Sequence, residues 1–424
     1  MRIAIVGTGI AGNVAAYKLR KEHDITVYEA SSYVGGHTNT VDVAEHDRTI
    51  AIDTGFIVFN DRTYPNFIGL LDEIGQESQA SVMSFSVSSG DGGLEYNGAG
   101  LNALFAQRRN ILRPPFFRMI RDILRFNREA MAAAPLEDDG QTVGEYLLRH
   151  GYGREFMNDY LVPMAAAIWS SEPVAIKDMP LQFLVRFFNH HGLLQLKDRP
   201  VWRVIKGGSR EYVKKLVAGH RDRIRLDSPV RRIIRHSTGV EIVTDRHGTE
   251  WYDAVFLACH SDQALTMLDK PTPVEREVLG AIHYQHNEAV LHTDESVLPK
   301  RRRAWAAWNY HIPKDPHRHV AVTYNMNMLQ GLDCDEQYCV TLNNDRQIDP
   351  AKMIKRIQYQ HPVFSRDAVV AQRRQEELNS ERTYFCGAYW RNGFHEDGVV
   401  SALHAVAHFE GRQSRGELHL RRAG

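Results

Sequence analysis

The sequence predicts a mixed α/β protein, α+β overall, whose first unit is a Rossmann-like βαβ fold. An apolar strand over residues 3–6 leads into the motif GTGIAG at residues 7–12, and a helix is expected over residues 10–20. A second apolar strand over residues 24–30 follows. Strand, glycine-rich turn, helix and strand in this order are typical of a unit that binds a nucleotide.

Each glycine of the motif has a separate physical reason. Gly7 permits the tight turn, Gly9 lets the backbone approach a diphosphate, and Gly12 lets the helix pack closely on the strand. The first turn of the helix then presents unpaired N–H groups and the positive end of the helix dipole to the phosphates. We therefore expect a diphosphate at this turn.

Glu29 ends the second strand, about twenty residues after the motif, where an acidic residue accepts hydrogen bonds from ribose hydroxyls. A 2′-phosphate would be repelled by this carboxylate. The sequence thus predicts an ADP group with a free ribose.

The order of the patterns predicts a discontinuous domain. Cofactor-binding patterns occupy residues 1–75, 200–270 and 370–424, and the middle block holds strands at 230–236, 240–245 and 251–259 that read as a β-meander. Residues 76–199 and 271–369 are expected to form a substrate domain of mixed sheet and helices. Within it we expect strands at 83–87, 288–293 and 320–325 and helices at 114–134, 143–169 and 350–359.

Composition excludes several classes of protein. The chain has 424 residues, 43% of them hydrophobic, with 52 basic and 52 acidic side chains, so a dedicated nucleic-acid binder is not expected. The 4 cysteines and 21 histidines show no spacing typical of metal ligands, and we expect no metal site. Residues 3–17 imitate a signal peptide but contain the glycine motif, and no apolar run is long enough to span a membrane. A cytoplasmic protein is expected.

The segment that follows Glu29 resembles a known superfamily. Gly35-Gly36-His37-Thr38 is similar to the segment found at this place in FAD-dependent amine oxidases, phytoene desaturases and protoporphyrinogen oxidases. The blocks at 50–56, 206–209 and 383–402 resemble the same proteins, so the resemblance extends in blocks over the whole chain. It implies a Rossmann-like FAD-binding domain of the glutathione-reductase type and noncovalent FAD.

The motif and the resemblance together imply a set of cofactor contacts. These are Gly7, Gly9, Ile10, Ala11, Gly12, Glu29, Ala30, Gly36, His37, Thr38, Thr54, Gly55, Phe56, Val230, Ala258, Gly387, Gly398 and Val399. The chain departs from the superfamily at two places. His37 stands where most members have arginine, and Ala388 and Tyr389 stand where most have an acidic residue that binds the ribityl chain.

The closest resemblance is to a bacterial group of FAD-dependent oxidoreductases associated with cyclopropane-fatty-acyl-phospholipid synthase-like methyltransferases. It rests on the blocks at 35–38, 59–61, 162–170 and 304–310. The association implies an unsaturated or methylated fatty acyl chain as substrate, oxidised, desaturated or isomerised by hydride transfer to flavin N5. Two alternatives remain: a flavin amine oxidase that uses oxygen, and a non-catalytic flavin-bearing partner of a lipid methyltransferase.

His395 is the candidate catalytic residue. The resemblance puts it in a loop before a final helix that starts near Gly398, where amine oxidases have an aromatic residue at the flavin face. An imidazole there offers a proton donor or acceptor with an ordinary pKa of about 6.5. A purely structural role in the loop is the alternative.

A basic segment over residues 108–128 could contact a membrane. It has seven arginines and one acidic residue, Asp122. The arginines are Arg108, Arg109, Arg113, Arg118, Arg121, Arg125 and Arg128. With the neighbouring Phe117, Ile120 and Leu124, this pattern predicts either a peripheral contact with an anionic membrane, at the inner membrane face, or a surface helix whose apolar stripe packs on the domain.

Overall fold

A five-stranded parallel sheet forms the centre of one part of the molecule. The computed structural model describes residues 1–89, 92–133, 140–195, 197–312, 321–344, 347–380 and 382–411. The sheet has the order β10-β2-β1-β14-β20. Its strands are β1 (Arg2–Val6), β2 (Asp24–Tyr28), β10 (Ile224–Arg225), β14 (Ala254–Leu257) and β20 (Thr383–Phe385). The predicted α/β class and the Rossmann-like unit are confirmed.

Register explains how this sheet gathers distant residues. Val6 pairs with both Tyr28 and Leu257, so the three central strands end side by side. The next residue of each strand, Gly7, Glu29 or Ala258, therefore lies at one carboxyl edge. Ligands of open parallel sheets bind at that edge.

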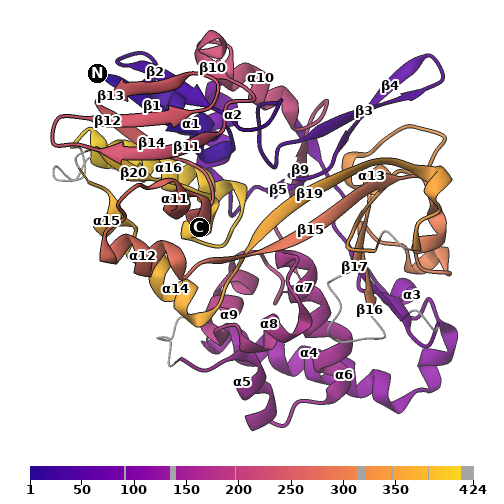
Figure 1. Ribbon diagram of the computed structural model, residues 1–424. Helices are drawn as coiled ribbons and strands as arrows, with labels where there is room; N and C mark the ends of the chain where they lie inside the picture. The colour runs from indigo at the N-terminus through magenta and orange to yellow at the C-terminus, as the bar shows by residue number, and fades with distance from the viewer. Residues whose placement is uncertain are drawn as a thin grey trace.

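Two helices cover one face of the parallel sheet, α1 (Ile10–Leu19) and α16 (His395–Phe409), and they pack against each other (Figure 1). Gly398 lies at their contact. A Cβ atom there would stand 2.6 Å from Ile10 Cγ2. Glycine is needed because the two helices approach too closely for any side chain.

The predicted β-meander is present, with one correction. Its strands are β11 (Val230–Arg235), β12 (Val240–Thr244) and β13 (Gly248–Tyr252), joined in antiparallel order. The single strand expected over residues 251–259 is wrong, because the chain leaves the meander at Tyr252 and enters the parallel sheet as β14. The change of sheet occurs at Asp253, whose N–H donates to Arg2 O of β1 at 2.8 Å. A continuous apolar run does not reveal a change of sheet.

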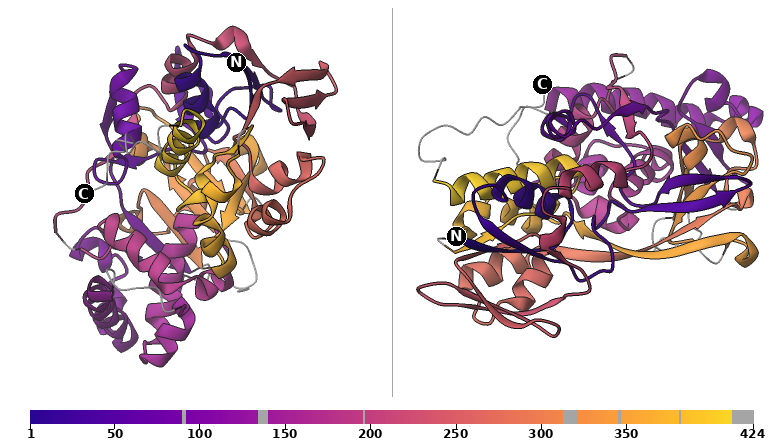
Figure 2. Two further views of the ribbon diagram at one scale, coloured as in Figure 1. Left: turned by 90° about the vertical axis from the view of Figure 1, so that its left-hand side faces the viewer. Right: turned by 90° about the horizontal axis from the view of Figure 1, so that it is seen from above.

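A seven-stranded sheet forms the other part of the molecule, in the order β19-β15-β18-β17-β16-β7-β8. Its long strands β15 and β19 extend along the molecule in orange tones in the right-hand view of Figure 2. The bounds are β7 (Phe85–Ser89), β8 (Glu95–Asn97), β15 (His283–His292), β16 (Trp308–Ile312), β17 (Ala321–Asn325), β18 (Cys339–Leu342) and β19 (Met353–Val363). Val320, expected to begin β17, is outside the described residues.

The helix expected over residues 350–359 is wrong. Only one 3₁₀ turn forms there (Pro350–Lys352), and the chain continues as β19. This strand pairs antiparallel with β15 from His283 opposite Val363 to His292 opposite Met353. Pairing with a strand some 70 residues away outweighs the local helical spacing, because β-structure depends on its partners more than on local propensity.

Helices cover the seven-stranded sheet at the lower end of Figure 1. The helix expected at 114–134 is confirmed as α4 (Pro114–Ala133). The region 143–169 is not one helix. It divides into α5 (Val143–Arg149), α6 (Arg154–Phe156), a π-helical turn (Met157–Leu161) and α7 (Val162–Trp169), with a break at Gly151, whose φ is 64°.

The remaining elements complete the two parts. The helices are α2 (Pro65–Glu73), α3 (Leu101–Leu104), α8 (Pro173–Asp178), α9 (Leu181–His190), α10 (Arg210–Val217), α11 (Ser261–Met267), α12 (Pro273–Gly280), α13 (Met326–Gln330), α14 (Arg366–Gln372) and α15 (Gln375–Leu378). The 3₁₀ segments include η1 (Arg108–Leu112) and η8 (Ala388–Trp390). The remaining strands are β3 (Thr40–Glu45), β4 (Arg48–Asp53), β5 (Phe59–Asn60), β6 (Ser78–Ala80) and β9 (Trp202–Ile205). The predicted domain limits stay a prediction, and residues 412–424 of the third block are outside the described chain.

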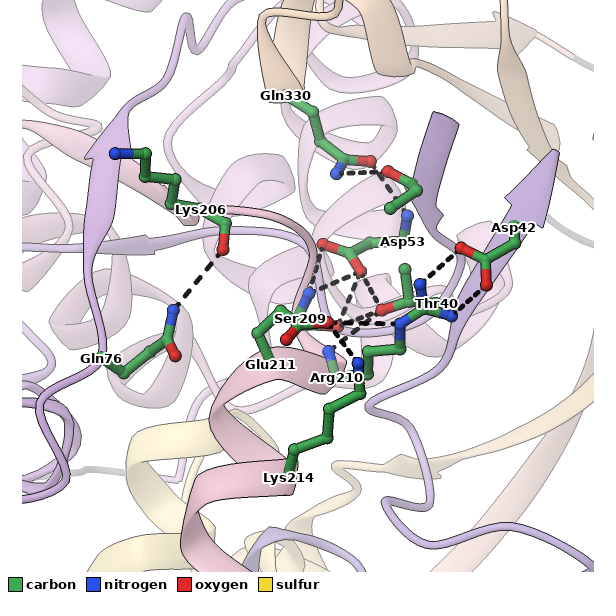
Figure 3. Close-up of polar contacts among 11 residues, drawn as sticks. Thr40, Asp42, Asp53, Gln76, Lys206, Ser209, Arg210, Glu211, Lys214 and Gln330 are labelled. Atoms are coloured by element: carbon green, nitrogen blue, oxygen red, sulfur yellow. Dashed lines mark hydrogen bonds and ion pairs between the residues drawn. The ribbon is translucent and has the colours of Figure 1, made fainter. Parts of the chain in front are cut away.

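Asp53 joins three distant segments (Figure 3). Its buried carboxylate accepts hydrogen bonds from the Ser209 N–H at 2.8 Å, the Ser209 hydroxyl at 2.8 Å and the Thr40 hydroxyl at 2.6 Å. Its N–H donates to Gln330 Oε1 at 2.9 Å. The β3–β4 hairpin, the start of α10 and the end of α13 are thereby fixed to one another. Burial raises the pKa of Asp53 to about 6, although these donors act in the opposite direction.

We expect Asp53→Asn to lower the free energy of unfolding by about 1–3 kcal/mol, because an amide nitrogen would replace one acceptor oxygen among these buried donors. Urea unfolding near neutral pH measures the change. Asp42→Asn, in the same hairpin, removes a surface pair with Arg210 and should cost less than about 1 kcal/mol. Equal losses in the two variants would contradict the role of Asp53.

Candidate functional site

The glycine turn at the carboxyl edge of the parallel sheet has the geometry that its sequence predicts. Gly7 has φ +103°, and a Cβ atom there would stand 2.7 Å from Ala258 O. A Cβ atom on Gly12 would stand 2.0 Å from Gly7 O. Gly9 differs, because a Cβ atom there would meet nothing within 4 Å. The turn is thus closed toward the protein and open in front of Gly9.

Helix α1 begins directly behind this open position. Gly9 precedes the helix and has no side chain to cap it, so the N–H groups of the first turn, which includes Ile10 and Ala11, receive no side-chain cap. Asn13 Nδ2 donates to Thr8 O at 2.6 Å and holds the turn in place. An uncapped helix start beside open space fits a phosphate group.

Glu29 supports the turn as well as facing it. Its Oε2 atom accepts from the Thr8 N–H at 2.9 Å and from the Thr8 hydroxyl at 2.5 Å. Its Oε1 atom accepts from the Ser31 N–H at 2.8 Å. The carboxylate is therefore fixed at the end of β2, and Oε1 keeps acceptor capacity for a ribose hydroxyl. The sequence did not indicate the bond to Thr8.

The second glycine pair lies against the first turn. Gly36 has φ +57°, and a Cβ atom there would stand 3.1 Å from Gly9 Cα. Gly35 has φ +134°, and its Cβ atom would stand 2.5 Å from Thr38 O. The backbone after β2 therefore passes close to the glycine turn, in agreement with a segment that crosses beneath a diphosphate.

His37 follows this pair and belongs to a cluster of rings. It stacks on Tyr359 with 4.9 Å between ring centroids, and its centroid lies 5.2 Å from that of His361 and 6.5 Å from that of His260. Burial, together with His260, lowers the pKa of His37 to about 4. A phosphate would thus meet an uncharged imidazole here at neutral pH. The sequence did not indicate the partners, which come from β19 and from the start of α11.

Thr54, Gly55 and Phe56 run beside this segment. A Cβ atom on Gly55 would stand 2.2 Å from His37 O, and the Phe56 N–H donates to His37 O at 2.7 Å. The Thr54 hydroxyl donates to Asn39 O at 2.9 Å. Two stretches of predicted cofactor contacts are therefore held together as one unit.

His395 lies in the first turn of α16 and not in a preceding loop. The helix begins three residues before Gly398, because the Asp397 carboxylate accepts from the Phe394 N–H at 2.9 Å and caps the helix start. Glu396 accepts from the Phe67 N–H at 2.8 Å and caps α2. Burial raises the pKa of Asp397 to about 7.

The His395 ring is held by two hydroxyl groups and one aromatic ring. Its Nε2 atom lies 3.0 Å from both Thr38 Oγ1 and Tyr212 OH, and these two oxygens are 2.6 Å apart. The ring stacks on Phe56 with 3.5 Å between centroids. Burial, with a contribution from His37, lowers the pKa of His395 well below its ordinary value. Sequence reasoning missed Tyr212, which no motif marks.

The other predicted contacts lie around the same edge of the sheet. Val230 packs in one apolar cluster with Val6 and Tyr28. The Gly387 N–H donates to Ser401 Oγ at 2.9 Å, while Val399 packs within the α1–α16 interface and Ala30 is exposed directly after Glu29. Over the part of the chain that the structure describes, no three His, Cys, Asp or Glu side chains form a group suited to a metal ion.

Comparison with known proteins gives concordant results. The family model for flavin containing amine oxidoreductases matches residues 10–304. A proposed flavin-containing monoamine oxidase of Mycobacterium tuberculosis is 26% identical over 294 residues, which cover 66% of this chain and 61% of the relative. The match thus spans less than two thirds of that relative's length.

Two solved structures have the same fold. Cyclohexylamine oxidase from Brevibacterium oxydans has a TM-score of 0.69 at 15% identity, with 98% of this chain and 99% of that chain covered. A fatty acid isomerase from P. acnes that produces CLA has a TM-score of 0.68 at 16% identity, with 96% and 98% covered.

We expect Glu29→Ala to weaken cofactor binding by about 30- to 1,000-fold, or on the order of 2–4 kcal/mol, because charge-assisted hydrogen bonds to the ribose and to Thr8 are lost. Dialysis followed by measurement of bound flavin tests this. Asp24→Ala is the matched control, because Asp24 is an exposed acid at the opposite end of the same strand. Full flavin occupancy in the Glu29 variant would show that the carboxylate does not bind the ribose.

Proposed function

The chain belongs to the family of flavin containing amine oxidoreductases, and on that premise we propose that it acts on an apolar substrate, an unsaturated or methylated fatty acyl chain, by oxidation, desaturation or isomerisation. The predicted superfamily and its cofactor FAD are confirmed by the family match. By family the chain is an FAD-dependent oxidoreductase. The acyl substrate is the new element, and the arguments for it come from the side chains next to His395.

A row of aromatic rings carries the proposal. Phe394, next to His395 in the chain, stacks on Phe187 of α9 at 5.2 Å between ring centroids. Phe187 contacts Trp169 of α7 at 4.7 Å, and Trp169 contacts Phe183 at 5.7 Å. Phe183 and Phe394 remain partly exposed. The middle rings, Phe187 and Trp169, are buried, so a substrate would meet the two partly exposed ends of the row. Aromatic rings at these ends favour an apolar substrate over a charged one.

The polar group beside this row is also uncharged. His191 stacks on Phe187 at 3.8 Å and lies near Phe394, and burial lowers its pKa to about 4. Trp169 Nε1 donates to Asn392 O at 3.2 Å, so this polar atom is already bound. The row therefore presents carbon surface to a substrate.

The chain's own residues define how the cofactor and the substrate are held. Gly9 and the first turn of α1 would hold the diphosphate, Glu29 the adenosine ribose, and the segments around Thr38 and Thr54 the flavin end. FAD supplies a ring that accepts a hydride when it is bound. The aromatic row would exclude water from the acyl chain and orient it toward the start of α16.

His395 is the proposed acid or base of the reaction. Both of its hydrogen bonds use Nε2, which leaves Nδ1 as the nitrogen available to a substrate. Its lowered pKa keeps the imidazole neutral near pH 7, so it accepts a proton rather than donating one at the start of the reaction. Tyr212 and Thr38 position the ring.

Anaerobic mixing of the purified holoprotein with acyl substrates and amines tests the proposed substrate. The panel comprises free fatty acids, acyl thioesters, phospholipids and primary or cyclic amines. We expect loss of flavin absorbance, or an altered double bond by mass spectrometry, only with acyl compounds. Reduction by amines alone would favour the amine oxidase alternative. No reaction with either class would favour a non-catalytic partner of a lipid methyltransferase.

We expect His395→Ala to slow flavin reduction or product formation by about 10²–10⁴-fold while FAD remains bound, the usual contribution of a positioned acid or base. Because the pKa of His395 lies well below 6.5, wild-type activity should not fall through protonation of this residue between pH 8 and pH 6.

Two further variants separate chemistry from packing. His395→Gln keeps a polar side chain but cannot titrate, and should not restore the rate. Tyr212→Phe removes one hydroxyl near Nε2 and should have a smaller effect, confined to the position of the ring. Wild-type turnover in both His395 variants would assign the proton to another group.

A further inference from the structure

Helix α4 carries an unusual exposed stripe. The side chains at positions separated by 4, 3, 4 and 3 residues all face solvent, and they alternate between apolar and cationic: Phe117, Arg121, Leu124, Arg128 and Met131. Phe117 is 47% exposed and Leu124 is 51% exposed. The opposite face of α4 is buried and apolar, through Phe116, Met119 and Phe126. The helix therefore packs with one apolar face and still presents apolar side chains on the other.

The exposed apolar surface continues before α4. Leu101 is 77% exposed and Leu112 is 86% exposed, on α3 and η1. Six of the fifteen large hydrophobic side chains exposed in the described chain fall within residues 101–131. Figure 1 shows α4 at the lower end of the molecule, away from the parallel sheet. A concentration of this kind at one end of a molecule marks an interaction surface.

The charges of this surface are positive, and three of its seven arginines pair with carboxylates: Arg118 with Glu155, Arg121 with Asp122 and Arg125 with Glu129. Arg108 donates to Phe105 O, Arg109 to Gly92 O, and Arg113 to Gly93 O, all backbone carbonyls. Within the ranges that the structure describes, no carboxylate pairs with these three side chains. The Arg121 side chain is 72% exposed, and its partner Asp122 is buried and also accepts from the Gly153 N–H.

We propose that the exposed face of α3, η1 and α4 binds the surface of an anionic phospholipid bilayer. Helix α4 would lie parallel to the bilayer, with Phe117, Leu124 and Leu112 in the boundary between headgroups and acyl chains. The arginines between them would contact lipid phosphates. Interfacial helices bind in this way, by apolar burial together with attraction to anionic lipids.

This surface also lies close to the proposed substrate row. Helix α4 packs against α9, and α9 carries Phe183 and Phe187 on the way to Phe394. An acyl chain taken from a bilayer would therefore need to pass only one layer of helices. Membrane binding does not depend on the proposed substrate, since it can be measured without turnover.

In the described part of the chain, no helix combines the length and the apolar character that crossing a membrane requires. The proposed contact is therefore at the surface of one leaflet. Its strength should fall as salt rises, because exposed charges are screened over about 8 Å at physiological ionic strength.

Sedimentation of the holoprotein with vesicles tests the proposal. Vesicles of phosphatidylcholine alone are compared with vesicles that contain phosphatidylglycerol. We expect binding to the anionic vesicles that is reversed by high salt, and at least about tenfold weaker binding for Arg121→Glu with Arg128→Glu. The double variant Phe117→Ser, Leu124→Ser should bind the anionic vesicles more weakly than the wild type even at low salt. Bound FAD and circular dichroism confirm that each variant is folded.

The control changes net charge equally at another place. The control is the double variant Lys270→Glu, Arg276→Glu, whose two side chains are exposed near the start of α12. This variant should bind vesicles like the wild type. Equal binding of the wild type to both kinds of vesicle would overturn the proposal. A second result would also overturn it. If no vesicle binding is seen, and light scattering shows dimers that Phe117→Ser abolishes, a second copy of the chain covers this face.

Discussion

The close approach of backbone segments at the carboxyl edge of the parallel sheet is the constraint on which the rest of the site depends. Gly7 meets Ala258, Gly12 meets Gly7, and Gly36 meets Gly9 at distances that leave no room for a Cβ atom or almost none. This close packing places the uncapped start of α1 next to the open space in front of Gly9. Any side chain at Gly7 or Gly12 would displace a strand or the helix and so change every later contact.

A second consequence of this packing is the position of α16. Gly398 allows α16 to lie on α1, and the start of α16 then brings His395 to Thr38, which directly follows the second glycine pair and His37. Residues more than 350 positions apart in the chain thus share one hydrogen-bond network. Close backbone contacts set the positions of the elements, and the polar side chains then form hydrogen bonds between them.

The sequence predicted those features of the fold that depend on neighbouring residues. The glycine motif, α1, Glu29 at the strand end and the amphipathic α4 all depend on residues near one another in sequence. The sequence could not show that residues 353–363 form a strand, since their partner β15 lies far away. The same holds for Tyr212 beside His395 and for Ser209 beside Asp53, whose contacts exist only after the fold has formed. The resemblance predicted a catalytic role for His395, which stays a prediction, and it did not predict the helical position of His395, which depends on the cap that Asp397 provides.

The cluster of His37, His260 and His361 gives the fold a sensitivity to acid. Burial lowers the pKa values of these rings to about 4, 4 and 3, and repulsion between the rings adds to the lowering at His37 and His361. The unfolded chain would bind protons on the same rings near pH 6.5. Their contribution to stability is therefore complete above about pH 6.5 and is lost progressively as the pH falls toward 4. The place where the segment after β2, the start of α11 and β19 meet thus holds three imidazoles that are neutral in the folded protein and whose counterparts in the unfolded chain gain protons as the pH falls.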